Sequence, residues 1–340
     1  MSNASSVLSG GVRVAVEVIG EGEPVTVVGH GLTQTRRDLV LLAPFLPGTK
    51  VLFDFRGHGE SERPGPGHYS MDDFASDVDN VAAAFGATCV AGTSLGAGAT
   101  LRLLCHRPDR FEKLVVILPA RLRPEARAGL LHLADLLEAH RLSEVAEIVI
   151  AEEEAAGRFD GFPASKELRR RSILAMNREG MPLAIRGCID DPPIRDPEPI
   201  RQVTATALVI AQEGDPVHDA DVARELTAML PRAELVLFPD RYSLIREIPA
   251  VVSRVSAFLA DRSPPCRGRE SGSGPGSLML RGFCSSTSIA EQFPHRLPAG
   301  GRRGRDPGRA KKGGNCSGSR HREVVQLREG VRLHLPGGWP

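Results

Sequence analysis

One stretch near the middle of the chain constrains the fold more than any other. A short apolar segment runs into a Gly-x-Ser-x-Gly turn and then into small helix formers, as Cys89-Val90-Ala91-Gly92-Thr93-Ser94-Leu95-Gly96-Ala97-Gly98-Ala99. A strand, a sharp turn and a helix in that order predict a nucleophile elbow, in which the serine hydroxyl is lifted above the end of a sheet. The alternative is a glycine-rich turn in an ordinary α/β protein.

The segments on either side of this stretch alternate between strand and helix patterns. Residues 12–18 alternate apolar and polar side chains, and a Gly-Glu-Gly turn then leads into the apolar run 25–28, so we expect a first hairpin followed by a central strand. Further strands are expected at 50–55, 89–93, 114–118, 207–210 and 234–238, and helices at 36–45, 71–85, 95–106, 220–230 and 248–260. Such alternation predicts a mostly parallel sheet with helices on both faces.

The alternation stops between residues 121 and 200. This segment is charged and helical in pattern, with helices expected at 128–141, 143–154 and 166–177, and it ends in a proline-rich loop. A helical insertion between two strands of a sheet predicts a lid over a binding site.

Charge divides the chain after Asp261. Residues 262–340 hold 15 Lys and Arg against 5 Asp and Glu, whereas the rest is acidic. We therefore divide the chain into one domain, residues 1–261, and a basic Gly/Pro/Arg/Ser-rich tail, 262–340, expected to be disordered. The tail is either a natural low-complexity segment or out-of-frame translation, and residues 12–261 are expected to fold without it. An acidic body argues against nucleic acid as a partner.

Nothing in the sequence predicts a membrane or secretory protein. The N-terminal residues lack the apolar core of a signal peptide, and no apolar run approaches the roughly 18 residues of a spanning helix. The six cysteines show no CxxC pairing. These patterns predict a reduced, cytoplasmic protein whose partner is a small molecule, and they leave the oligomeric state open.

Four motifs in strand order extend the argument to a family. They are His30-Gly31, Asp54-x-Arg56-Gly57-His58-Gly59-x-Ser61, Gly92-x-Ser94-x-Gly96 and Gly214-Asp215, after the third, fourth, fifth and seventh expected strands. With them, residues 12–261 resemble the α/β-hydrolase fold superfamily, near its bacterial esterase, lactonase and cofactor-free haloperoxidase-like branch. The resemblance implies an eight-stranded, mostly parallel sheet with a helical lid, and no cofactor or metal.

The resemblance also implies roles for individual residues. Ser94 would be the nucleophile and Asp215 the acid of a catalytic triad, and the backbone N–H groups of Leu32 and Leu95 would form the oxyanion hole. Leu95 begins a helix, where unpaired N–H groups and the helix dipole favour a negative charge. The other motif residues have structural interpretations: His30 and His58 are expected to pack or to bond backbone groups, and Asp54 to cap its loop.

The chain departs from the family at the catalytic histidine. The loop after the last strand, residues 239–247, contains no histidine, and Tyr242 occupies the matching position. A phenol, with an ordinary pKa of about 10, cannot accept the serine proton at neutral pH. His218 is a second candidate base because it follows Asp215 by three residues, but we expect it to contact Asp215 more readily than Ser94. The tail histidines, His295, His321 and His334, lie in a segment too irregular to hold a base.

Three functions remain open at this point. The first is hydrolysis of small esters or lactones through an acyl-enzyme on Ser94, with an incomplete triad. The second is a binding protein that keeps the pocket without turnover. The third is lyase or cyclase chemistry in which Tyr242 donates a hydrogen bond or proton. Substrate identity depends on the shape of lid and pocket, which the sequence does not fix.

Overall fold

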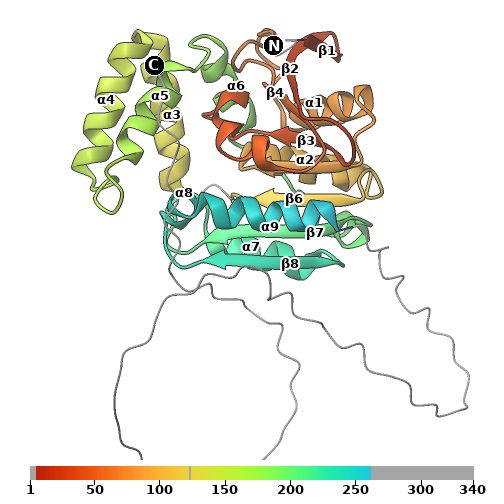
Figure 1. Ribbon diagram of the computed structural model, residues 1–340. Helices are drawn as coiled ribbons and strands as arrows, with labels where there is room; N and C mark the ends of the chain where they lie inside the picture. The colour runs from red at the N-terminus through yellow and green to blue at the C-terminus, as the bar shows by residue number, and fades with distance from the viewer. Residues whose placement is uncertain (1–4, 122–123, 262–340) are drawn as a thin grey trace, which may run out of the picture. The chain divides into compact units, whose positions relative to one another are not determined.

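The computed structural model describes residues 5–121 and 124–261, so the expectations for the tail lie outside the described residues (Figure 1). The described residues contain an eight-stranded sheet in the order β1-β2-β4-β3-β5-β6-β7-β8. The strands are β1 Ser5–Ser9, β2 Val12–Ile19, β3 Val25–Gly29, β4 Thr49–Phe53, β5 Cys89–Thr93, β6 Lys113–Ile117, β7 Thr206–Gln212 and β8 Ala233–Phe238. Pairing is antiparallel from β1 through β2 to β4 and parallel from there to β8. The predicted mostly parallel sheet is confirmed.

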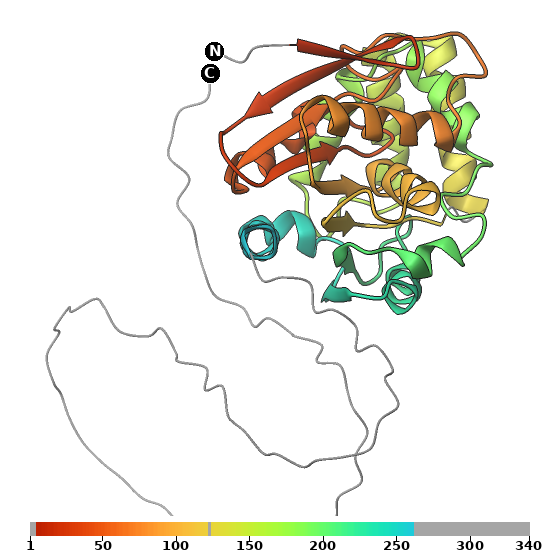
Figure 2. The ribbon, with the colours of Figure 1, turned by 90° about the vertical axis from the view of Figure 1, so that its right-hand side faces the viewer.

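Helices cover both faces of this sheet, as the view in Figure 2 shows for α9 on one side and α7 on the other. The face carrying Val27 and Val90 packs against α1 Met71–Ala84, α2 Leu95–His106 and α7 Ala220–Met229. The face carrying Val28 and Ala91 packs against η1 Arg36–Leu41, η2 Ala43–Phe45 and α9 Ile248–Ala260. Neighbouring strand residues thus enter opposite cores, which is why the central strands are continuously apolar.

One local expectation is wrong and another is confirmed. The helix expected over residues 36–45 is two short 3₁₀ helices, because Pro44 has no N–H to donate and its ring clashes with the preceding turn. The expected first hairpin is confirmed, since β1 pairs antiparallel with β2, and β3 follows it as a central strand of the sheet. On its other side β2 pairs with β4.

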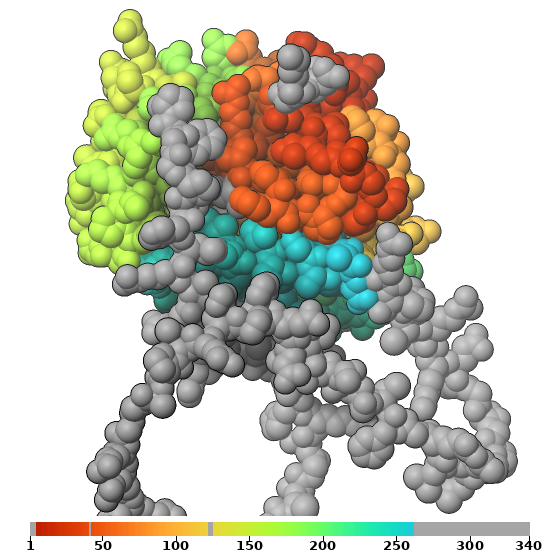
Figure 3. All heavy atoms as spheres, viewed as in Figure 1, coloured from red at the N-terminus to blue at the C-terminus, as the bar shows by residue number. Residues whose placement is uncertain are grey.

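The insertion between β6 and β7 is helical, as expected, but it has four main helices. They are α3 Pro124–Ala139, α4 Leu142–Ala155, α5 Ser165–Leu174 and α6 Gly180–Cys188. In Figure 3 the helices α3, α4 and α5 form a yellow-green lobe beside the orange residues that follow β3. The four helices of the insertion share an apolar core of their own, which includes Leu137, Val149 and Ile185. Leu32 packs against this core and against the main core, so the loop after β3 joins the two.

The fourth helix of this insertion, which we call the lid, is α6. It was not predicted because glycine and proline lower its helix propensity. Its glycines allow close approach to the body. A Cβ on Gly180 would overlap the backbone of Gly57, and one on Gly187 would lie 2.9 Å from the carbonyl oxygen of Tyr69. The lid therefore packs directly on the loop that contains Gly57.

Candidate functional site

The turn between β5 and α2 has the strained geometry of an elbow. Ser94 has φ 51° and ψ −105°, a backbone conformation that side-chain-bearing residues rarely adopt. A Cβ on Gly92 would lie 2.5 Å from the carbonyl oxygen of Gly96, and one on Gly96 would lie 2.5 Å from that of Gly29. Only glycine fits at either position. Ser94 is partly exposed, and its N–H donates to the carbonyl of Ile117 at 3.0 Å.

The imidazole of His218 lies between Ser94 and Asp215. Its Nε2 is 3.0 Å from Ser94 Oγ, and its Nδ1 is 3.3 Å from Asp215 Oδ2. One tautomer satisfies both contacts, with the proton on Nδ1 facing the carboxylate and the lone pair of Nε2 facing the hydroxyl. His218 thus reaches Ser94 as well as Asp215, although we expected contact with Asp215 to be the more readily made of the two.

The conformation of the β7–α7 loop explains this reach. Gly214 has φ +67°, and Asp215 Oδ1 accepts the N–H groups of Val217 and His218, each at 2.9 Å. The carboxylate thus closes a tight turn that brings the His218 ring back over the ends of the strands. Asp219 then caps α7 by accepting the N–H of Asp221, which fixes the far end of the loop.

Hydrogen bonds hold Asp215 as a carboxylate. Burial alone would raise the pKa of Asp215, but hydrogen bonds from His218 and from the Gln212 side chain outweigh it and keep the pKa well below its ordinary value. Gln212 Nε2 donates to Asp215 Oδ2 at 2.9 Å. Gln212 was not predicted as a site residue, although a glutamine directly after the apolar run 207–211 is visible in the sequence.

The two residues expected to supply oxyanion N–H groups lie on adjacent segments. Leu95 is the first residue of α2, where helical N–H groups have no partner within the helix. The loop carrying Leu32 is tied to α2 because the N–H of Gly96 donates to the carbonyl of His30 at 3.0 Å. On its other side, His58 Nε2 lies 2.7 Å from the carbonyl oxygen of Leu32.

His30 and His58 have structural positions, in agreement with their expected packing. Both are fully buried, and their rings lie 5.1 Å apart. His30 accepts the N–H of Phe55 at Nε2, and its Nδ1 lies 2.8 Å from the carbonyl of Gly31. Burial, reinforced by the nearby His58, lowers the pKa of His30 to about 3, so its ring is neutral at neutral pH. Burial also lowers the pKa of His58.

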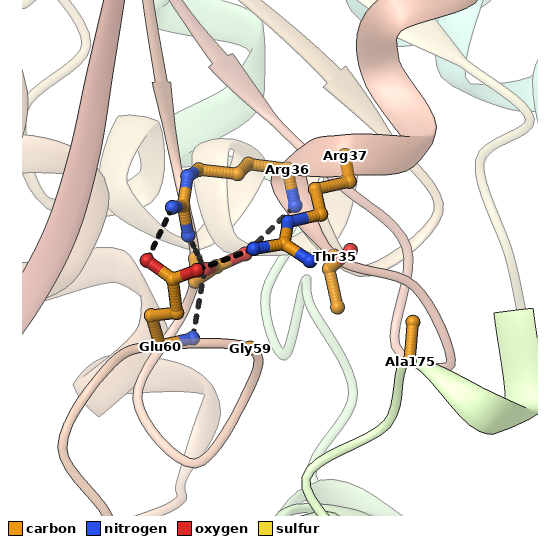
Figure 4. A pocket seen from close by; sticks show the side chains of 7 residues that line it. Thr35, Arg36, Arg37, Gly59, Glu60 and Ala175 are labelled. Carbon is orange, nitrogen blue, oxygen red and sulfur yellow. Dashed lines mark hydrogen bonds and ion pairs between the residues drawn. The ribbon is translucent and has the colours of Figure 1, made fainter. Parts of the chain in front are cut away.

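Asp54 caps its loop, as expected, and borders a small cavity. Its carboxylate accepts the N–H of Arg36 at 2.7 Å and the N–H of Glu60 at 3.0 Å. Figure 4 shows the side chains of Arg36, Arg37 and Glu60 meeting at this cavity of about 120 Å³. Each guanidinium already faces a carboxylate, so the cavity offers no uncompensated charge for a ligand.

Tyr242, at the position where the family has its catalytic histidine, is hydrogen-bonded to the helical insertion. Its hydroxyl donates to the carbonyl of Arg158 in the lid, at 2.9 Å. The single phenolic proton is therefore engaged in this bond and does not point to a ligand. The His218 imidazole of the neighbouring loop lies between Ser94 and Asp215, where the resemblance implies a histidine of the loop after β8.

No group of three or more His, Cys, Asp or Glu side chains among residues 5–121 and 124–261 has the arrangement of a metal site. Within the same residues, no helix combines the length and the apolar character needed to cross a membrane.

Among curated proteins, the chain is similar to a protein of Caulobacter segnis named as a carbamate hydrolase, RutD. The two are 37% identical over an alignment of 107 positions, and the match covers 26% of this chain and 40% of that protein, so it spans about two fifths of the relative.

Among solved structures, a hydrolase from Pseudomonas aeruginosa has a TM-score of 0.64 at 24% identity, over 76% of this chain and 99% of that one. The enol-lactonase from Burkholderia xenovorans has a TM-score of 0.64 at 21% identity, over 76% and 100%. These likenesses establish the fold. The profile of the α/β hydrolase fold family matches residues 42–245, more than half of the chain, and the protein therefore belongs to the α/β-hydrolase fold family.

Proposed function

We propose that this protein is a serine hydrolase that cleaves small carboxylic esters, lactones or carbamates through an acyl-enzyme on Ser94. The observation that carries the proposal is the His218 imidazole between Ser94 and Asp215, at 3.0 and 3.3 Å. Nucleophile, base and orienting carboxylate within hydrogen-bonding reach are the arrangement that activates a serine.

In the acylation step, Ser94 Oγ attacks the substrate's carbonyl carbon while its proton passes to His218 Nε2. The carbonyl oxygen becomes an oxyanion, which the N–H groups of Leu32 and Leu95 would stabilise. Collapse of this intermediate breaks the bond to the leaving group, which takes the proton from His218. Water then repeats the sequence on the acyl-enzyme and releases the acid. Asp215 stabilises the imidazolium formed in each half-reaction.

The substrate class rests on reaction type and on likeness. Esters, lactones and carbamates all present a carbonyl carbon bonded to a leaving heteroatom, so one nucleophile and one oxyanion hole serve all three. A carbamate is included because of the name of the Caulobacter segnis relative, and a lactone because of the Burkholderia enol-lactonase, which shares the fold. The inserted helices, whose apolar core contacts Leu32, would decide among them as a lid.

The test compares single variants on p-nitrophenyl acetate. Wild type should release p-nitrophenol, and Ser94→Ala or His218→Ala should each lower kcat by roughly 10³- to 10⁶-fold, because either change removes the proton-transfer pair. Mass spectrometry should find the acetyl group on Ser94. If Ser94→Ala keeps the wild-type rate, or if wild type binds esters without turning them over, the proposal is refuted and a binding protein is the better description.

A further inference from the structure

The loop after β8 is bonded to the lid at the turn between α4 and α5. Tyr242 Oη donates to the carbonyl of Arg158 at 2.9 Å, and Arg241 Nη2 donates to that of Gly157 at 3.1 Å. The Tyr242 ring packs against Gly161, where a Cβ would overlap it, and the Arg241 guanidinium lies 4.7 Å from the ring centre. We call these contacts the lid latch.

A buried amide connects the same loop to the candidate triad. Gln212, only 5% exposed, accepts the N–H of Leu244 at Oε1, at 3.2 Å, and donates from Nε2 to Asp215 Oδ2, at 2.9 Å. The oxygen that it contacts is also the one that faces His218 Nδ1. Leu244 follows Tyr242 by two residues, so the amide spans the short gap between the latch loop and the carboxylate.

We propose that Gln212 is a positioning residue that couples docking of the lid at Tyr242 to the orientation of Asp215 and, through it, of His218. The inference rests on the proposed function, because it assigns the coupling to the triad of that reaction. When the latch holds the loop after β8 in place, the Leu244 N–H fixes the Gln212 amide. The amide then holds the carboxylate toward the imidazole. Undocking of the lid turn would release that loop and loosen the triad.

The test uses three variants of the full chain. Tyr242→Phe removes only the latch hydroxyl, and Gln212→Met keeps the side-chain length but removes both hydrogen bonds. Tyr69→Phe is the matched control, since Tyr69 Oη also donates to a backbone carbonyl, that of Pro64, at 2.9 Å, but without a link to Gln212. Each is assayed with p-nitrophenyl acetate and with a fluorophosphonate, from which Ser94 Oγ displaces fluoride while its proton passes to His218.

A role in positioning predicts a specific pattern. Gln212→Met should lower kcat and the rate of fluorophosphonate labelling by about 10- to 100-fold, with KM unchanged, because small displacements of a catalytic group have effects of that size. Tyr242→Phe should lower both by about 2- to 10-fold, and Tyr69→Phe by less than about twofold. The double variant should match Gln212→Met within about twofold, because coupled residues are not additive. Circular dichroism checks that each variant is folded.

Contrary results are equally specific. Wild-type rates in Gln212→Met, multiplicative effects in the double variant, or a change confined to KM would overturn the coupling. If Gln212→Met does not fold, Tyr242→Phe against Tyr69→Phe decides the matter: equal rates overturn the coupling, and a loss only in Tyr242→Phe supports it. Wild type that resists labelling at Ser94 would instead refute the proposed function, so the two failures are distinguishable.

Discussion

Acid should destabilise this protein through His30 by an amount that the structure allows us to work out. The ring is fully buried, with Nε2 accepting the N–H of Phe55 at 3.1 Å and Nδ1 2.8 Å from the carbonyl of Gly31. The neutral Nδ1–H tautomer satisfies both partners, and a proton added at Nε2 would break the bond from Phe55. This geometry agrees with the lowered pKa of His30, about 3, which burial causes.

The sign of the effect follows from comparing the folded and unfolded states. An unfolded histidine takes up a proton below about pH 6.5, whereas His30 in the folded protein does so only near pH 3. Its contribution to stability is therefore complete above pH 6.5 and is lost as pH falls from there toward 3. Between pH 7 and pH 5, this single group should remove about 2 kcal/mol from the free energy of unfolding.

Urea unfolding at these two pH values, on wild type and His30→Asn, measures the difference. The asparagine amide can still donate to Gly31 but leaves the Phe55 N–H unpaired, so the variant should be less stable at both pH values by about 1–3 kcal/mol. Its loss between pH 7 and pH 5 should be about 2 kcal/mol smaller than that of wild type. His106→Asn, at a 63% exposed side chain, is the control. Equal pH dependence in wild type and His30→Asn would refute the reasoning.

Three further outcomes are expected. Gly96→Ala should lower the free energy of unfolding by about 1–3 kcal/mol, because its Cβ would lie 2.5 Å from the Gly29 carbonyl oxygen. Gly129→Ala, in open space on a helix, should raise the free energy of unfolding by about 0.5–1 kcal/mol. Urea unfolding that ranks the two variants the other way contradicts this. Asp215→Asn should lower kcat on p-nitrophenyl acetate by about 10⁴-fold, and a loss below tenfold would exclude Asp215 as the orienting acid. Tyr242→His should lower kcat because imidazole loses the bond to the lid, whereas an incomplete triad at this position predicts a rise in the same assay.

Much of the fold could be predicted because the sheet's cores impose local patterns. The strand before Ser94 is continuously apolar since both of its faces are buried, and the glycines around the turn are required by backbone contacts close in space. Element α6 could not be predicted in the same way. Its stability comes from packing on Gly57 and Tyr69, which are distant in sequence, and this contact overrides a weak local preference for helix.

In the candidate site, too, some residues could be predicted from the sequence and others could not. The motifs identified Ser94 and Asp215 because each follows a strand at a fixed place in the fold. Whether His218 could reach Ser94 depended on the turn that Asp215 Oδ1 closes with two backbone N–H groups. It also depended on the strand order, in which only β6 separates β5, before Ser94, from β7, before Asp215. Both are properties of the folded chain. The spacing of three residues between Asp215 and His218 was visible, but its geometry was not.

In the proposed triad the acid, Asp215, and the base, His218, lie on one loop. One oxygen of Asp215 fixes the backbone of His218 by accepting its N–H, and the other faces the His218 ring, so a single carboxylate sets both the path and the tilt of the base. Because these contacts lie within four residues, they involve no other loop. What must come from outside the loop is the direction of the pair relative to Ser94. Gln212, anchored to β7 and to the Leu244 N–H, is placed to supply it.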